Sequence, residues 1–240
     1  DRSKLDSLLE KVIGHTSDLI ESFRLGNAIK NGIPVAIAGA TNTGKSTLLN
    51  ALLGEERAIV SDIHGTTRDT IEEILNINGI LFRFIDTAGL RETSEVVEQI
   101  GIERTFRKIS EASIILGMVD LTRDFESTSE TVREIISKVD FESQKLVFLL
   151  NKTDISELNK IVTIKNFIVS ELDNKDIADE TADHLILEVS AKPGDGIRTL
   201  KELLASIQRD MTSDNSVTLV TNQRHVQALT DARTSLLRVR

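Results

Sequence analysis

Cysteine is absent from this sequence of 240 residues, and so are tryptophan and tyrosine. Without cysteine the chain can form neither a disulfide nor a thiolate metal site. Eight phenylalanines leave a core that must be mainly aliphatic. The lack of other large aromatic rings also argues against a platform on which single-stranded nucleic acid bases stack.

Long hydrophobic runs are also missing. No run approaches the roughly 18 to 20 apolar residues of a membrane-spanning helix, and no signal peptide is visible. We therefore expect a cytoplasmic protein with no membrane partner. The formal net charge is -9, whereas a protein that binds RNA by itself usually carries a basic face. Contact with RNA would need another domain or a partner.

Short apolar runs alternate with helical patterns along the chain. This alternation predicts an α/β fold with a mostly parallel sheet and helices on both faces. A hairpin at 71–86, which turns at Asn78-Gly79, adds two strands. Helices are expected at 46–54 and at about 197–210. The runs typical of buried parallel strands are IPVAIAG (33–39), SIILGMVD (113–120), KLVFLLN (145–151) and HLILEVS (184–190).

Two helical patterns bracket this α/β unit. The first has apolar residues at spacings of three and four from Leu5 to Phe23, and the second starts near Gln223 after a polar linker. Each apolar face needs a partner, so we expect the flanks to form one discontinuous helical domain. The chain starts without Met and ends within a helical pattern, so we expect a piece of a longer protein. The predicted boundaries are a helical segment at 1–31, the α/β unit at 32–211, and a linker with a helical segment at 212–240.

The stretch GATNTGKS (39–46) lies between a predicted strand and a predicted helix, which is the context of a phosphate-binding P-loop. Gly39 and Gly44 allow the backbone to turn so that its amides face the phosphates, and a helix N-terminus favours an anion. Lys45 can reach the β- and γ-phosphates, and the Ser46 hydroxyl can bind Mg²⁺. A chance glycine-rich turn is the alternative. The predicted phosphate-binding residues are Asn42, Thr43, Gly44, Lys45, Ser46 and Thr47.

The tetrapeptide NKTD (151–154) ends a predicted strand, where open α/β sheets bind ligands. The Asp154 carboxylate can accept hydrogen bonds from guanine N1–H and its 2-amino group. Adenine offers neither donor, so such a site can discriminate by roughly 10⁴-fold. Asn151 would brace the loop, and the stem of Lys152 would cover the base. SAK (190–192) ends the next strand and would add a contact from the Ala191 backbone. The predicted base-binding residues are Asn151, Lys152, Asp154, Ser190, Ala191 and Lys192.

Two further motifs lie where loops that sense the γ-phosphate are expected. In DTAG (86–89), Asp86 can hold the water shell of the metal, and the Gly89 amide can meet the γ-phosphate. In GTTRD (65–69), a threonine can complete the Mg²⁺ shell when the γ-phosphate is present, which makes the loop a switch. Thr67 is favoured over Thr66 as this ligand. The alternatives are a carboxylate that caps a turn and a solvated polar loop.

Taken together, these motifs resemble a translation-factor-type small GTPase with the Ras-like P-loop fold. Three longer stretches are more specific: LLNALLGEERAIVSDIHGTTRDTIEE, DTAGLRETSEVVEQIGIERT and NQRHVQAL. They resemble the MnmE (TrmE) family of tRNA wobble-uridine modification GTPases, over nearly the whole chain and both helical flanks. The resemblance implies binding of GTP and GDP, hydrolysis with Mg²⁺ and K⁺, an MnmG (GidA)-type flavoprotein partner, and tRNA contact through the full-length complex.

The resemblance also assigns roles to individual residues. Leu90 stands where Ras-like proteins carry a water-orienting Gln. The family instead uses a potassium ion, bound by a P-loop Asn and switch I carbonyls, in a homodimer of G domains. Asn42 matches that Asn, and Glu98 matches a switch II Glu that positions the water, beside Lys45 as the other catalytic residue. Thr41 stands where the family commonly has Pro. The matching switch I loop contains Ser61, Ile63 and Thr66.

Two other interpretations stay open. An Era-like or Der-like ribosome-assembly GTPase shares the nucleotide motifs, but a basic RNA-binding domain or a second GTPase unit should then follow the α/β unit. A P-loop ATPase would explain GATNTGKS but not NKTD and SAK. The amphipathic helical flanks favour the MnmE-type interpretation.

Overall fold

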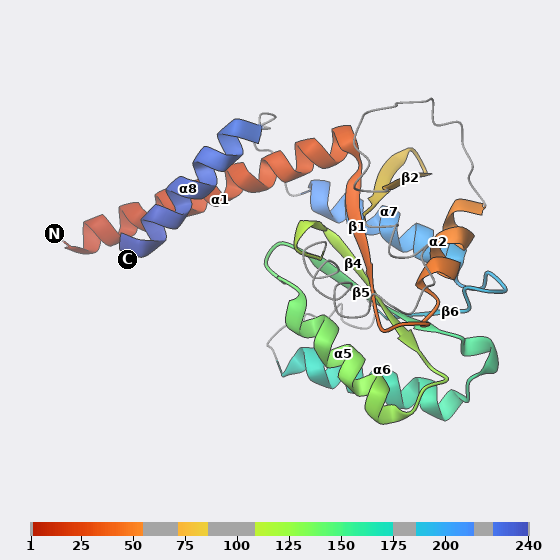
Figure 1. The fold of residues 1–240 in the computed structure, drawn as a ribbon. Coiled ribbons are helices and arrows are strands. Elements are labelled where there is room, and N and C mark those ends of the chain that lie inside the picture. Colours follow the sequence, from red (N-terminus) through yellow and green to blue (C-terminus); the bar gives the residue numbers. More distant parts are fainter. Residues whose placement is uncertain (1, 55–71, 86–108, 175–185, 214–222, 240) are drawn as a thin grey trace, which may run out of the picture. The chain divides into compact units, whose positions relative to one another are not determined.

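The computed structural model describes residues 2–54, 72–85, 109–174, 186–213 and 223–239 (Figure 1). The chain forms two compact units: one spans Ile33–Ala205, and the other combines Asp1–Gly32 with Ser206–Arg240. Within the described ranges no helix combines the length and the apolar character that crossing a bilayer requires.

A mixed sheet of six strands forms the centre of the first unit, in the order β2-β3-β1-β4-β5-β6. Only β2 and β3 pair antiparallel; the other neighbouring strands are parallel. The predicted α/β fold with a mostly parallel sheet is therefore confirmed. The strands are β1 (Ile33–Ala38), β2 (Glu73–Ile77), β3 (Ile80–Phe84), β4 (Ile114–Asp120), β5 (Lys145–Asn151) and β6 (Ile186–Val189).

The hairpin and the central strands follow directly from their sequences. Asn78 and Gly79 both have positive φ, 53° and 86°, as a two-residue hairpin turn of type I′ requires. Every residue of β4 is buried, as are all residues of β5 after Lys145. A continuous apolar run fits these strands because helices cover both faces of a parallel sheet.

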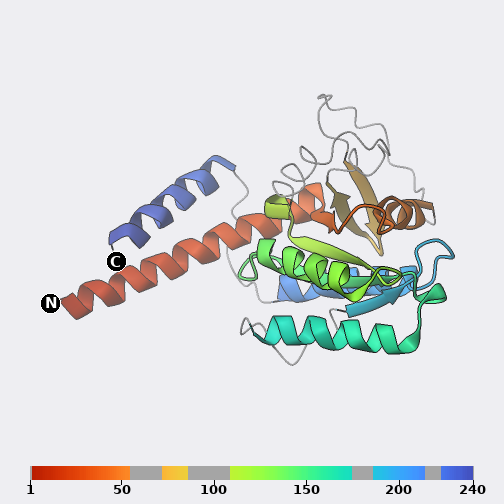
Figure 2. The same cartoon turned by 60° about the horizontal axis from the view of Figure 1, so that its bottom comes forward.

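Among the described residues, three helices and a short 3-10 turn lie between strands, and a fourth helix follows the last strand. Figures 1 and 2 show α5 and α6 together on one face of the sheet, with α2 and α7 toward the other. On the first face, Val132, Ile135 and Ile164 pack with Val119 and Phe148 in one apolar cluster. The elements are α2 (Lys45–Gly54), α5 (Phe125–Lys138), η1 (Thr153–Ile155), α6 (Leu158–Asp173) and α7 (Ile197–Ser213).

Helix α5 begins directly after the turn that follows β4, and Asp124 caps its N-terminus. The Asp124 carboxylate accepts hydrogen bonds from the Ser127 amide and hydroxyl, at 2.8 and 2.9 Å. An acidic N-cap satisfies a backbone amide that has no partner within the helix. These bonds, the amide's first, lower the pKa of Asp124. The turn between β4 and α5 therefore has a defined end.

The second unit contains α1 (Arg2–Asn31) and α8 (Gln223–Val239), which contact each other. The views of Figures 1 and 2 both place α8 alongside α1. Thr16 and Ile20 of α1 are buried, and the Thr16 hydroxyl donates to the Val12 carbonyl. The contact gives each helix a partner for part of its surface.

Candidate functional site

The carboxyl ends of parallel strands bring three polar loops to one edge of the sheet. The register pairs Asp120 of β4 with Asn151 of β5, and Asn151 with Val189 of β6. The strands therefore end in step. Open α/β sheets bind ligands at this edge, and the residues that follow β1, β5 and β6 are the three motifs GATNTGKS, NKTD and SAK.

The loop after β1 has a backbone that only glycine allows at two positions. Gly39 has φ +148° and Gly44 has φ +101°. A Cβ on Gly39 would lie 2.4 Å from the Met118 carbonyl oxygen, and a Cβ on Gly44 would lie 2.4 Å from Nδ2 of Asn151. Since both contacts are far below van der Waals distance, the glycines allow the loop to pack against β4 and β5.

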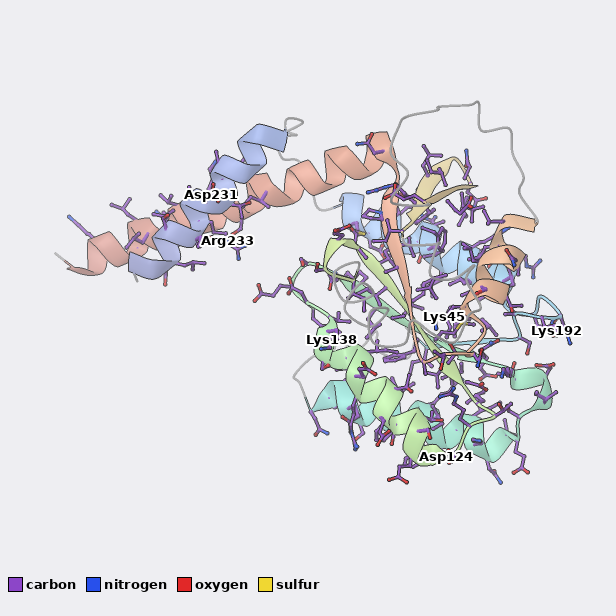
Figure 3. All side chains as sticks on the ribbon, viewed as in Figure 1. Lys45, Asp124, Lys138, Lys192, Asp231 and Arg233 are labelled. Carbon is purple, nitrogen blue, oxygen red and sulfur yellow. The ribbon has the colours of Figure 1, made fainter. Side chains whose placement is uncertain are left out.

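Lys45, labelled in Figure 3 at the start of α2, folds back over this loop. Its ammonium donates to the carbonyls of Gly39 and Ala40, at 2.9 and 2.7 Å. Burial, and then the positive charge of Arg123, lower the pKa of Lys45 to about 8. At neutral pH the ammonium therefore stays mostly charged at the phosphate end, while Ser46 follows it in the first turn of the helix.

A single buried side chain joins the loops after β1, β5 and β6. The Asn151 amide donates through Nδ2 to the Thr43 carbonyl at 2.7 Å. Its Oδ1 accepts from the Ala191 backbone amide at 3.0 Å. Asn151 is 3% exposed, so water does not compete with these bonds. The phosphate loop and the two base loops are consequently held in one arrangement.

Ser190 fixes the direction of the Asp154 carboxylate. The Ser190 hydroxyl donates to Oδ1 of Asp154 at 2.7 Å and accepts from the Asp154 amide at 3.0 Å. Thr153 adds a bond of 3.2 Å from its hydroxyl to the Val189 carbonyl. Ser190 is buried whereas Asp154 is exposed. The carboxylate is thus anchored from below and open to a ligand from outside.

Lys152 is paired with Asp120, a residue that belongs to none of the sequence motifs. The Lys152 ammonium lies 2.6 Å from Oδ2 of Asp120, and Oδ1 accepts from the amide and hydroxyl of Thr122. Burial raises the pKa of Asp120, but the bonds from Lys152 and Thr122 outweigh it and the net pKa is lowered. An acidic residue at the end of a fully buried strand was the available sequence signal.

Arg123 was also missed. Its guanidinium donates to the Thr41 carbonyl of the phosphate loop at 2.7 Å, and its own carbonyl accepts from the Lys160 ammonium. Arg123 and Thr41 are 82 positions apart, and no local pattern joins them. Arg123 therefore belongs to the site by tertiary contact alone.

The described residues thus bring together the predicted positions of the P-loop, NKTD and SAK. Thr47 and Lys192 are exposed, the second in the loop after β6 (Figure 3). The other predicted site residues lie outside the described residues: Ser61, Ile63, Thr66, Thr67, Asp86, Gly89 and Glu98.

Comparisons with known proteins agree with this architecture. A family model described as 50S ribosome-binding GTPase matches residues 34–152. The tRNA modification GTPases MnmE of Parabacteroides distasonis and Porphyromonas gingivalis are 45% and 46% identical over 239 and 242 residues. Each match covers 100% of this chain and 49% of the relative. The chain therefore spans about half the length of these relatives.

Two solved structures support the same fold. Era of Aquifex aeolicus, bound to GDP and aluminium fluoride, matches with TM-score 0.50 and 29% identity over 73% of this chain and 56% of that chain. A bacterial selenocysteine-specific elongation factor matches with TM-score 0.51 and 22% identity over 74% of this chain and 29% of that one, and shows the fold alone. The P-loop GTPase fold is confirmed, and the chain belongs to the MnmE tRNA modification GTPase family, about half of whose length it represents.

Proposed function

We propose that this chain binds guanine nucleotide across its three polar loops and hydrolyses GTP as the GTPase domain of a tRNA wobble-uridine modification protein. The observation that carries the proposal is the Asn151 side chain, which is bonded to the P-loop at Thr43 and to the loop after β6 at Ala191. A phosphate-binding loop and a base-binding loop gain from such a brace because a preorganised site loses less entropy when the ligand binds.

At the base end, the Asp154 carboxylate selects guanine over adenine. Ser190 holds one carboxylate oxygen at 2.7 Å, and the exposed side chain then accepts from guanine N1–H and the 2-amino group. An adenine nucleotide would leave this oriented carboxylate unpaired, which is a strong basis for discrimination. The stem of Lys152 covers the base, and the Ala191 and Lys192 loop closes its edge.

At the phosphate end, the amides of residues 42–47 and the Lys45 ammonium bind the phosphate oxygens. The carbonyls that now accept from this ammonium belong to the same loop, so a short movement brings it to the β- and γ-phosphates. Ser46 offers a hydroxyl oxygen, a ligand type that suits Mg²⁺. When bound, Mg²⁺ neutralises phosphate charge. Thr67, Asp86 and Gly89 remain predicted contributors from loops outside the described residues.

We also propose that hydrolysis depends on potassium and takes place in a homodimer of G domains. Its support is Asn42, which lies exposed at a left-handed position of the P-loop with φ 62°. An amide oxygen there suits a monovalent cation, which offsets transition-state charge. Glu98 would position the attacking water. The switch I carbonyls proposed as further ligands are Ser61, Ile63 and Thr66.

The substrate of the whole protein is proposed from its relatives, whose names describe tRNA modification GTPases. Because this chain spans 49% of those relatives, tRNA modification would require further domains, an MnmG-type flavoprotein partner and a cytoplasmic setting. We further propose the boundaries 1–31, 32–211 and 212–240, with the outer segments in one helical domain. An Era-like role has less support, since the Era match covers 73% of this chain, whereas the MnmE relatives cover all of it.

The test is GTP turnover in KCl and in NaCl, measured at several protein concentrations, with Asn42→Ala beside the wild type. The proposal predicts faster turnover in KCl, a rise steeper than linear with protein concentration, and loss of both effects in the variant. Slow turnover that is identical in the two salts would contradict the potassium mechanism. Failure to turn over or bind GTP in either salt would contradict the nucleotide site itself.

A further inference from the structure

Strained backbone in the described residues marks the two ends of the nucleotide site. Outside glycine, positive φ occurs there at Asn42 (62°), Asn78 (53°) and Lys152 (68°). The hairpin turn requires the conformation of Asn78, whereas Asn42 lies in the P-loop and Lys152 in the base loop. Such conformations cost free energy and persist only where the surroundings hold them, which is common at functional sites.

The base-loop residue is held from the turn between β4 and α5. Lys152 has both a left-handed backbone and an ammonium fixed on Oδ2 of Asp120 at 2.6 Å. Thr122 occupies the other oxygen through its amide and its hydroxyl, at 2.9 and 2.7 Å. Asp120 is 5% exposed, so its carboxylate is a rigid anchor. A lysine backbone is not stabilised locally at positive φ. The bond to Asp120 therefore helps to hold Lys152 in this conformation.

The P-loop residue is held from the same turn. Arg123 donates to the Thr41 carbonyl at 2.7 Å, and Thr41 directly precedes Asn42. The backbone of Arg123 is itself held, because its carbonyl accepts from the Lys160 ammonium of α6. The Asp124 cap then fixes the end of the turn.

We propose that the β4–α5 turn, residues 120–123, is a clamp that holds the P-loop and the base loop, with Asp120 and Arg123 as positioning residues. This inference rests on the proposed nucleotide site. The two residues act on different steps. Asp120 positions the Lys152 stem against the base, which is the same in GDP and GTP, so it contributes uniform binding. Arg123 positions the loop at Asn42, beside the γ-phosphate, so it contributes chiefly to turnover.

The test compares the 240-residue chain with Asp120→Asn, Arg123→Gln and Arg123→Lys. GDP affinity is measured by isothermal titration, and turnover is measured at saturating GTP in KCl. Asp120→Asn keeps the size and an acceptor oxygen but removes the charge that holds Lys152, so GDP affinity should fall about tenfold with turnover within about twofold of wild type. Arg123→Gln should lower turnover about tenfold and GDP affinity by less than about threefold. Arg123→Lys, which keeps the charge and a donor, should recover most turnover.

Two matched substitutions outside the turn serve as controls for the general effect of removing a charge. Asp140→Asn alters a carboxylate that likewise accepts from an amide two residues on and from a hydroxyl, at Glu142 and Ser143. Arg133→Gln alters an arginine of α5 that pairs with Glu171. Both should leave affinity and turnover at wild-type values. Thermal melting of every variant checks the fold.

The outcomes separate the clamp from the site on which it rests. If the wild type does not bind GDP, the proposed function fails. If the wild type binds and Asp120→Asn and Arg123→Gln both match it, the clamp alone is overturned. The clamp is also overturned if each variant lowers affinity, turnover and melting temperature together, which is a merely structural effect. If Asp120→Asn does not fold, the arginine variants test the clamp. Arg123→Gln should then lower turnover more than GDP affinity, and Arg123→Lys should restore turnover; any other result overturns the clamp.

Discussion

The phosphate end and the base end of the candidate site are held together by different parts of the chain. The phosphate end consists of backbone: Gly39 and Gly44 allow a tight loop, and Lys45 is bonded to loop carbonyls. The base end depends on side chains: the Ser190 hydroxyl donates to the Asp154 carboxylate, and Oδ1 of Asn151 accepts from the Ala191 amide. A steric change should therefore break the phosphate end, whereas removal of a polar atom should break the base end.

The largest effect is expected where the two ends touch. Gly44→Ala places a methyl group 2.4 Å from Nδ2 of Asn151 at a residue with φ +101°. Asn151 cannot yield because both of its polar atoms are bonded. Overpacking and backbone strain together should weaken GDP binding about 100-fold or more.

Isothermal titration with GDP measures this effect. Gly54→Ala is the control, because nothing lies within 4 Å of a Cβ there, and it should bind GDP normally. Wild-type affinity in Gly44→Ala would show that the loops are not packed as the structure has them.

The next largest effect concerns the brace between the ends. Asn151→Ala leaves the Thr43 carbonyl and the Ala191 amide without their partner. An unpaired buried polar group costs about 1 to 3 kcal/mol, so GDP affinity should fall roughly 30-fold and unfolding should become easier. Urea unfolding and GDP titration measure both quantities, with Asn174→Ala at the exposed end of α6 as the control. Equal affinity in Asn151→Ala and wild type would contradict the bracing role.

A smaller effect should be confined to the base end. Ser190→Ala removes the hydroxyl that donates to Asp154, so the carboxylate must be ordered when the ligand binds. One lost charge-assisted hydrogen bond corresponds to about a tenfold loss in GDP affinity, while weak binding of ADP should not change. Competition titration measures both ligands. Ser137→Ala, whose hydroxyl donates within α5, serves as the control, and an equal loss for GDP and ADP would contradict base-specific positioning.

The smallest effect is a pH dependence at Asp120. Its folded-state pKa lies below the ordinary value of 3.8, so the folded protein binds fewer protons there than the unfolded chain. The stability from this carboxylate is fully present above pH 3.8 and is lost as the pH falls through the lower folded value. Urea unfolding at pH 7 should show Asp120→Asn about 1 kcal/mol less stable than wild type. The difference should shrink below pH 4, and a constant difference would contradict the pairing with Lys152.

Local pattern was sufficient to predict most of the fold. The run KLVFLLN was predicted at 145–151 and forms β5 over Lys145–Asn151, because a continuous apolar run suits a strand buried on both sides. The hairpin turn at Asn78-Gly79 followed from the positive φ that this pair tolerates. The strand of SIILGMVD starts one residue later than predicted, at Ile114.

The candidate site was predicted only where a motif lies within one loop. Asp120 and Arg123 contact residues 32 and 82 positions away, and such pairings depend on the order of strands in the sheet. The motifs could indicate that Asn151 braces a loop, but not that its two bonds reach both the P-loop and the loop after β6. The predicted switch residues lie outside the described residues and stay predictions.

The central claim is that these loops form one site for guanine, and nucleotide selectivity tests it most directly. GDP, ADP and XDP are titrated against the wild type and Asp154→Asn. Xanthine carries a carbonyl where guanine carries the 2-amino group, so the amide of Asn would donate where the carboxylate accepted. The account predicts that the wild type prefers GDP over ADP by roughly 10⁴-fold and that Asp154→Asn binds XDP better than GDP. Equal affinities for GDP and ADP in the wild type, or no change of preference in the variant, would contradict it.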